Sequence, residues 1–262
     1  MSPKTISIIR KTGLFTKGLV YTLMGALTAL AILNMGGKAS GKKEIGTFLK
    51  SQPLGNLLLA AVALGLLAYT LWRFYQAYAD PGAEKKKERI PTRIRYAYSG
   101  FFYGFIAYGF IKILFNASSG GNKKQQLLAK LLEEGWGLYA VGVVAALVLG
   151  QSIFQFKKGI SGDYMDKLDN HPEAKREYQL IKKAGLLGYL SRGIVFLVIS
   201  YLLVRVILDH NANRYQDTQG VFHYISSLTF GDYLLGIVAI GLILYGIFNI
   251  MVARNASLTR VS

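Results

Sequence analysis

The chain has 262 residues, of which 52% are hydrophobic and only 17% are charged, and its mean hydropathy is +0.31. It carries 31 Lys and Arg against 14 Asp and Glu, a formal charge of +17, and no Cys. The absence of Cys excludes disulfides and thiolate metal sites. The charges lie mainly between apolar stretches, so the basic surplus indicates contact with anionic lipid head groups rather than nucleic acid.

Six apolar runs follow one another, each long enough to cross a hydrocarbon core about 30 Å thick as a helix. They cover residues 13–33, 54–78, 96–115, 136–156, 185–208 and 230–252. None shows the regular polar stripe of a helix that borders water, and strands of a membrane barrel would be shorter, alternating segments. The first run lacks a small-residue cleavage site, so we expect it to be a retained anchor. The sequence therefore predicts an all-α integral membrane protein with six transmembrane helices.

The same two-helix unit occurs three times along the chain. A Gly-x-x-Tyr/Phe motif opens the first helix of each unit, at Gly18, Gly100 and Gly193, and another glycine opens the second helix, at Gly55, Gly137 and Gly231. The step from the first unit to the second is 82 residues in both helices; the step to the third is 175 and 176. Such a constant register is typical of internal repeats. It predicts repeats at 10–80, 93–160 and 183–255 within one membrane domain.

Each repeat enters and leaves the membrane on the same side, so the three repeats are parallel. Parallel repeats are related by an axis along the membrane normal, which predicts a pseudo-threefold bundle. A short i,i+4 apolar pair between the two helices of each repeat predicts an amphipathic helix at the outer interface or over the bundle. These pairs are Ile45 with Leu49, Leu127 with Leu131, and Val221 with Ile225. Lys and Arg are most frequent on the side of the termini, so we expect both termini to be cytoplasmic, in a bacterial cytoplasmic (inner) membrane.

At this point the chain resembles a known family. The three tandem units, and above all the second helices "PLGNLLLAAVALGLLAYTLWRFYQA" and "TFGDYLLGIVAIGLILYGIFNIMVA", are similar to the bacterial membrane family of domain of unknown function 1206. The resemblance covers residues 10–255; the middle copy departs from it at Gln151, where the other two copies have Tyr. It implies three tandem two-helix membrane repeats, and it brings no activity with it.

Polar residues within the apolar runs are the candidate site residues, because polar groups are costly among lipid tails and are expected to face the bundle. The repeat register aligns Arg73, Gln155 and Asn249, with Tyr69, Gln151 and Tyr245 four residues earlier. If the second helices face the axis, these residues line a common cavity that could hold an anionic solute. The alternative is that Arg73 reaches the head groups while the two amides bond across helices.

The other candidate residues are cations. Lys112 and Arg205 align as an outer cationic pair, each four residues before a polar residue, and either snorkelling or attraction of an anion accounts for them. Head-group contact on the cytoplasmic side is expected for Lys17, Arg192, Lys85, Lys86 and Lys87.

No catalytic pattern emerges from the sequence. The three histidines lie in loops, and neither a phosphate-binding loop nor a nucleophile elbow is present. We therefore expect no cofactor, no metal and no enzymatic activity. The function that we expect is that of an accessory or scaffold protein that binds anionic lipid or a membrane-protein partner; the oligomeric state stays open. The alternative is a transporter or channel for a small anion, with its site on the pseudo-threefold axis.

Overall fold

The computed structural model describes residues 3–33, 42–79, 89–115, 130, 134, 136–165, 175–209 and 218–255, and the account below concerns these residues. This part of the chain is helical and contains no strand. Six long helices are apolar enough to cross a membrane: α1 (Pro3–Ile32), α3 (Gly55–Ala79), α4 (Arg89–Leu114), α6 (Gly137–Ser161), α7 (Lys175–Leu208) and α9 (Gly231–Arg254). The all-helical membrane class with six spans is therefore confirmed.

The first helices of the first and third repeats are longer than their apolar runs. α1 begins at Pro3 and α7 at Lys175, about ten residues before the predicted spans, because basic residues such as Arg10 and Lys182 continue the helix without adding to its hydropathy. As a result Lys17 and Arg192 lie well inside their helices rather than at the ends. This difference decides where their charges are placed.

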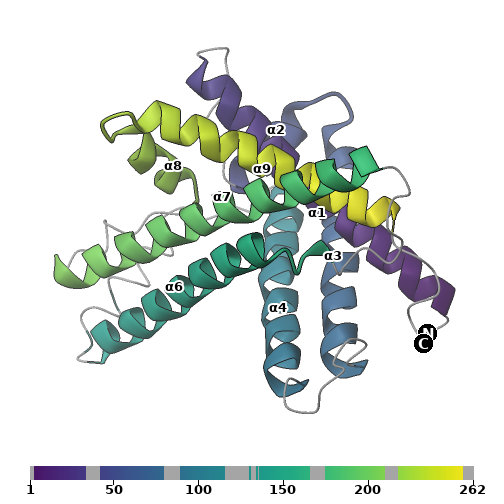
Figure 1. Cartoon of the computed structure of the whole chain (residues 1–262), viewed down its shortest axis with the longest axis horizontal. Helices are drawn as coiled ribbons and strands as arrows, with labels where there is room; N and C mark the ends of the chain where they lie inside the picture. The colour runs from purple at the N-terminus through teal and green to yellow at the C-terminus, as the bar shows by residue number, and fades with distance from the viewer. Residues whose placement is uncertain are drawn as a thin grey trace.

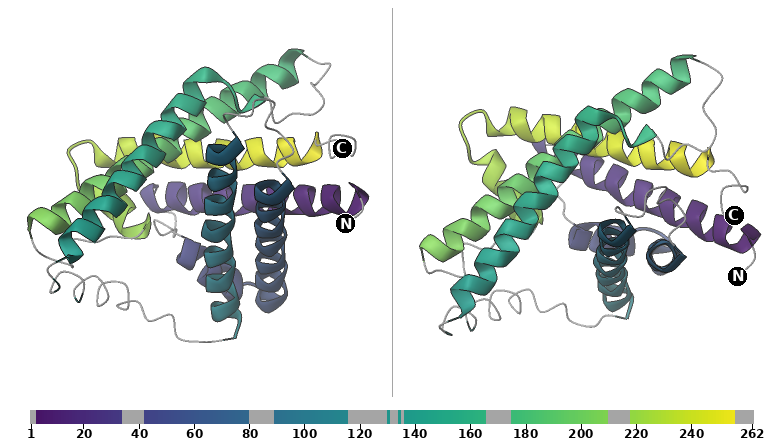
Figure 2. Two further views of the ribbon diagram at one scale, coloured as in Figure 1. Left: turned by 90° about the horizontal axis from the view of Figure 1, so that it is seen from below. Right: turned by 60° about the horizontal axis from the view of Figure 1, so that its bottom comes forward.

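The long helices pack in a cyclic order that follows the repeats. The second helix of each repeat packs against the first helix of the next: α3 on α4, α6 on α7, and α9 back onto α1 (Figure 1). Within the first and third repeats, α1 also packs on α3 and α7 on α9. Figure 2 shows α3 and α4 running across α1 and α9, so that the helix pairs cross near the middle of the molecule.

The three repeat glycines occupy equivalent places in this cycle. A Cβ on Gly18 would come within 2.6 Å of Ile250, one on Gly100 within 3.0 Å of Phe74, and one on Gly193 within 2.8 Å of Phe156. The three partners are themselves related by the repeat register, being 82 and 176 residues apart. The three repeat glycines therefore share one structural role, that of close approach between neighbouring repeats.

The cycle is open at one place, between α4 and α6 of the middle repeat. In the first repeat Gly13 of α1 lies against the backbone of Tyr69, with a Cβ-to-Cα distance of only 2.5 Å; in the third, Gly188 lies equally close to Tyr245. The register places Arg95 at this position in the middle repeat. An arginine does not permit such a backbone approach. Here the Arg95 guanidinium lies over the ring of Phe154, 5.3 Å from its centroid, and α4 and α6 diverge from this side-chain contact (Figure 2).

A second pair of closely packed glycines, in the second helices of the first and third repeats, is also replaced by a large residue in the middle repeat. Gly65 of α3 meets Thr16, and Gly241 of α9 meets Ser191, with Cβ-to-Oγ distances below 2 Å in both repeats. The middle repeat has Leu147 here, and its side chain is 68% exposed. The sequence of the middle repeat therefore explains the open seam: both closely packed glycines of the other repeats have been replaced by large side chains.

Two short helices cover the bundle at the far ends of the first and third repeats. In α2 (Lys42–Ser51) Ile45 and Leu49 are buried, and in α8 (Thr218–Ser226) Val221 and Ile225 are buried. α2 packs on α3 and α4, and α8 on α9 and α7. The apolar pairs thus cap the bundle, which was one of the two uses predicted. The corresponding pair at 127 and 131 lies outside the described residues.

The close contact between α1 and α9 supplies a test of this packing. Gly25→Ala would place a Cβ 2.4 Å from the carbonyl oxygen of Ala239, a backbone atom that cannot move aside, so we expect destabilisation of about 1–3 kcal/mol. Gly236→Ala in α9 is the matched control, because a Cβ there meets nothing within 4 Å. Thermal unfolding in detergent measures both; equal melting temperatures for the two variants would contradict the packing described here.

Candidate functional site

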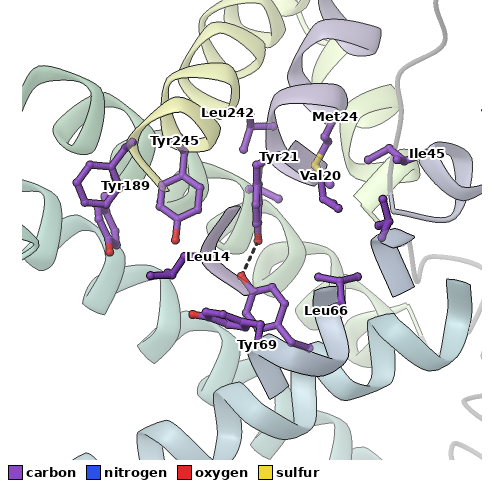
Figure 3. Close-up of a cluster of buried hydrophobic side chains, with 14 of the residues drawn as sticks. Leu14, Val20, Tyr21, Met24, Ile45, Leu66, Tyr69, Tyr189, Leu242 and Tyr245 are labelled. Atoms are coloured by element: carbon purple, nitrogen blue, oxygen red, sulfur yellow. Dashed lines mark hydrogen bonds between the residues drawn. The ribbon is translucent and has the colours of Figure 1, made fainter. Parts of the chain in front are cut away.

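Five tyrosines from five helices gather where the helix pairs cross: Tyr21, Tyr69, Tyr103, Tyr189 and Tyr245, all of them buried. Figure 3 labels Tyr21, Tyr69, Tyr189 and Tyr245, whose rings lie between the helices. The rings meet edge to face, with centroids 4.9 Å apart for Tyr21 and Tyr245 and 4.6 Å apart for Tyr69 and Tyr103. The hydroxyls of Tyr21 and Tyr103 lie 3.4 Å apart, as the dashed line in Figure 3 marks. The cluster is an apolar shell with hydroxyl groups on its inside.

Lys17 of α1 points into this shell. Its side chain is only 3% exposed, and its Nζ donates a hydrogen bond of 2.8 Å to the Tyr245 hydroxyl and a longer one of 3.5 Å to the Tyr69 hydroxyl. The ammonium also lies over three rings, 5.0 Å from the centroid of Tyr245, 5.2 Å from Tyr69 and 5.4 Å from Tyr103. Aromatic faces therefore surround the cation in place of water.

Arg192 of α7 approaches the same tyrosine from the other side. It is 9% exposed, its Nη1 donates to the Tyr245 hydroxyl, and its guanidinium lies 4.6 Å from the centroid of that ring. With its amide oxygen turned towards Arg192, Gln155 of α6 accepts hydrogen bonds of 3.1 Å from Nη2 and 3.3 Å from Nη1. In this orientation Gln155 also accepts from Nε2 of Gln151 at 3.3 Å.

Arg73 of α3 completes the set of cations. Its Nε donates a 2.8 Å hydrogen bond to the Tyr69 hydroxyl, to which its Nη2 also donates, and its Nη1 donates to Oε1 of Gln76 at 2.7 Å. Unlike Lys17 and Arg192, Arg73 is only half-buried. Tyr69 thus bridges Arg73 and Lys17, while Tyr245 bridges Lys17 and Arg192.

The cluster contains three cationic side chains, and none of the described residues brings a carboxylate to it. Within the described residues the hydrogen-bonding partners of these cations are tyrosine hydroxyls and glutamine amides, and none of them forms an ion pair. Burial of a charge costs several kcal/mol unless an opposite charge compensates it, and a cation–aromatic contact returns only about 0.5–2 kcal/mol. The site therefore has a deficit of negative charge.

The hydroxyls of Tyr69 and Tyr245 also lack an acceptor for their own protons. Each oxygen accepts from two cations, and neither hydroxyl donates to an acceptor within the described chain. Hydrogen-bond donors therefore greatly outnumber acceptors in the cluster. A group that carries negative charge and only accepts hydrogen bonds is the chemical complement of this arrangement.

The polar layer predicted from the register is only partly brought together. Gln155 contacts Arg192, and Arg73 reaches the cluster through Tyr69. Asn249 is buried but donates its amide proton to the backbone carbonyl of Tyr245 in its own helix, at 2.6 Å. Its amide is therefore occupied locally, and a cavity common to all three residues stays a prediction.

The head-group assignment of two cations is wrong. Lys17 and Arg192 lie inside the protein among tyrosines, and not at a lipid-facing surface. The sequence signal was available, because both residues directly precede a repeat glycine and are thus related by the register. The other residues with this assignment, at 85–87, lie outside the described part of the chain.

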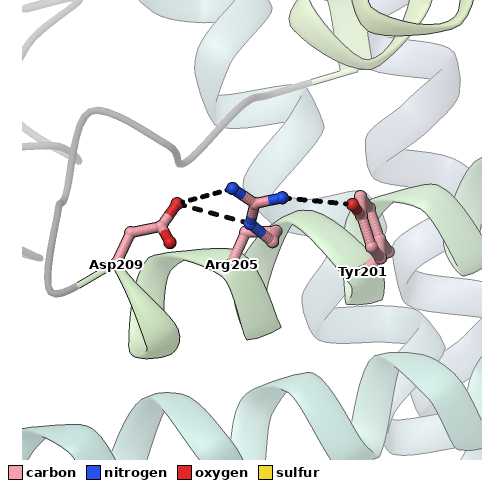
Figure 4. A network of polar contacts seen from close by, with 3 residues as sticks. All are labelled: Tyr201, Arg205 and Asp209. Carbon is pink, nitrogen blue, oxygen red and sulfur yellow. Dashed lines mark hydrogen bonds and ion pairs between the residues drawn. The ribbon is translucent and has the colours of Figure 1, made fainter.

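The outer cations remain separate from this site. Arg205 forms a 3.0 Å ion pair with Asp209 and a long hydrogen bond to Tyr201 on the exposed face of α7 (Figure 4). Lys112 lies over the ring of Tyr108 in its own helix, 4.8 Å from the centroid. Each cation thus has a partner on its own helix, and no contact in the described chain joins the two. The same part of the chain holds no group of three or more His, Cys, Asp or Glu that could bind a metal ion.

Comparison with known proteins agrees with the repeat register. The chain is 28% identical over 244 residues to the uncharacterized protein YxxB of Bacillus subtilis (strain 168), an alignment that covers 92% of this chain and 88% of that protein. No solved structure matches the chain. The model of the family "Domain of Unknown Function (DUF1206)" matches three consecutive segments, residues 12–80, 94–162 and 187–256. Because these segments cover most of the sequence and coincide with the three two-helix units, the chain belongs to the DUF1206 family, of which it contains three tandem repeats.

Proposed function

We propose that this membrane protein binds a small oxyanion at the cluster of Lys17, Arg73 and Arg192. The observation that carries the proposal is the convergence of three buried or half-buried cations without a carboxylate, around two tyrosine hydroxyls that have no acceptor. An oxyanion accepts several hydrogen bonds at once, so it would neutralise charge and satisfy donors together. The proposed role is one of binding and not of catalysis.

The test is an anion panel on the purified protein in a neutral detergent. Melting temperatures are measured against phosphate, sulfate, acetate and chloride at constant ionic strength. We expect saturable stabilisation by the oxyanions, by about 2.7 kcal/mol when the anion is present at 100 times its Kd. A control protein with Lys182→Gln and Lys183→Gln, two exposed cations of α7, should respond like the wild type. A rise that depends only on ionic strength, or equal melting temperatures throughout, would overturn the proposal.

Transport of the same anion is the second candidate function. All six long helices, from all three repeats, contribute residues to the cluster or contact it, so movement of any repeat would alter the site. With both termini cytoplasmic, as the loop charges favour, the basic loops would raise the anion concentration at the cytoplasmic face. Anion flux into liposomes distinguishes a transporter from a protein that only binds.

A further inference from the structure

Five cations and four aromatic rings alternate from the edge of the open seam to the central cluster. The seam is the gap between α4 and α6, and its edge carries Arg95 and Lys158. The order of contacts is Lys158, Phe154, Arg95, Tyr96, Arg73, Tyr69, Lys17, Tyr245 and Arg192, and every cation-to-centroid distance along it lies between 4.6 and 5.7 Å. Exposure rises towards the seam: Lys17 is buried, Arg73 and Lys158 are half-buried, and Arg95 is exposed.

The seam itself is amphipathic, and the repeat register identifies its lining. In the other two repeats this face is formed by Gly13 and Gly188 with their partners; in the middle repeat the equivalent positions are Arg95, Tyr98, Leu147 and Gln151. Tyr98 is 52% exposed and Leu147 68% exposed. Apolar side chains thus continue along the seam from a pair of cations at one end.

Within the described residues, neither cation at that end forms an ion pair with a carboxylate. Arg95 and Lys158 share the ring of Phe154, at 5.3 and 5.7 Å from its centroid, so two like charges lie on one aromatic side chain. Helices α4 and α6 also have the smallest buried share of the six spans, 22% each.

We propose that an anionic phospholipid occupies this seam, with its phosphate on Arg95 and Lys158 and an acyl chain along Leu147. The cations at one end of the seam require a negatively charged group, and the exposed apolar lining beyond them requires an apolar chain. A phospholipid of net negative charge has a charged head group followed by acyl chains, in this order. A free anion would have no use for the apolar lining. The site is distinct from the central cluster, so the proposal stands even if that cluster binds nothing.

The test is the retention of lipid by the full-length protein, measured by native mass spectrometry after exchange into detergent with phosphatidylglycerol or phosphatidylcholine. We expect the wild type to retain phosphatidylglycerol at least tenfold more than phosphatidylcholine. Arg95→Gln with Lys158→Gln should weaken that retention roughly tenfold or more. The matched control, Lys182→Gln with Lys183→Gln, removes the same charge from an exposed helix surface and should retain lipid like the wild type.

Further measurements separate the possible results. Excess inorganic phosphate should not displace the lipid; if it does, the seam binds a free anion and the lipid proposal is wrong. A wild-type protein that is dimeric and retains no lipid would show that a second copy fills the seam. If the double variant fails to fold, Lys158→Gln alone is used, with retained elution volume as the criterion of folding. Equal retention by Lys17→Met and wild type is expected, and it shows that a failure of central anion binding leaves this proposal intact.

Discussion

Lys17→Met is expected to weaken anion binding at least tenfold while leaving the protein folded. Met resembles Lys in length and volume, and it removes the charge that lies between Tyr69 and Tyr245. The remaining arginines would then lack the cation that joins their two tyrosines. We expect the variant to need at least ten times more phosphate than the wild type for the same rise in melting temperature. A tenfold weaker affinity corresponds to about 1.4 kcal/mol of binding free energy.

The stability of Lys17→Met in the absence of anion provides a second prediction, because a structural role and a ligand-binding role of Lys17 predict changes of opposite sign in the free energy of unfolding. If Lys17 only supported the structure, its loss would remove two hydrogen bonds and destabilise the fold by about 1 kcal/mol for each. If it is an uncompensated charge kept for a ligand, an apolar residue of similar volume should be neutral or stabilising. Thermal unfolding in phosphate-free buffer distinguishes the two cases. A strongly destabilised Lys17→Met whose response to phosphate is unchanged would assign Lys17 a structural role.

The repeat register predicted the fold because the register and the spans follow from two features that are visible in the sequence, the recurring glycines and the lengths of the apolar runs. Gly18, Gly100 and Gly193 recur at a constant spacing, and at each of them a Cβ would come within 3.0 Å of the second helix of the neighbouring repeat. The lengths of the spans follow from the thickness of the bilayer. A pseudo-threefold bundle was the simplest consequence. The cyclic order of packing between repeats agrees with it, whereas the two helices of the middle repeat, α4 and α6, do not pack together as α1 does with α3 and α7 with α9.

The open seam could also have been predicted, but from a difference between repeats and not from their similarity. Arg95 and Leu147 stand where the other repeats have glycine, and this contrast is visible in the sequence once the register is known. What the sequence does not contain is the role of those glycines. Their need for close contact becomes evident only from the 2.5 Å approach of Gly13 and Gly188 to the facing helices.

The central cluster was predicted in part. Arg73, Tyr69 and Tyr245 were selected because polar groups within apolar runs are expected to face protein. Lys17 was misassigned, since hydropathy places the start of the first span at residue 13, whereas the helix begins at Pro3. A cation four residues from the start of an apolar run resembles a head-group anchor, whereas in the structure Lys17 is buried among the tyrosines at the helix crossing.

Gln155→Glu is expected to reproduce the stabilising effect of an added anion, because it supplies the missing negative charge from within the protein. The Gln155 amide lies 3.1 Å from Nη2 of Arg192, so a carboxylate of the same shape would form a buried ion pair there. Charge-assisted hydrogen bonds to a guanidinium contribute about 1.5–3 kcal/mol, against a cost of burying the new charge that the three nearby cations offset. We therefore expect a protein that is more stable without anion than the wild type.

The same variant should no longer respond to phosphate, since the internal carboxylate repels the incoming anion and has already satisfied Arg192. Gln52→Glu is the matched control for the phosphate response: it makes the same isosteric change on the turn after α2, where the amide donates only to Phe48 and Ser51, so its gain in stability from phosphate should equal that of the wild type. Thermal unfolding of the three proteins with and without phosphate decides the matter. If Gln155→Glu is less stable than wild type and still gains stability from phosphate, then the cations at the helix crossing are not short of negative charge, and the anion site must be sought elsewhere in the bundle.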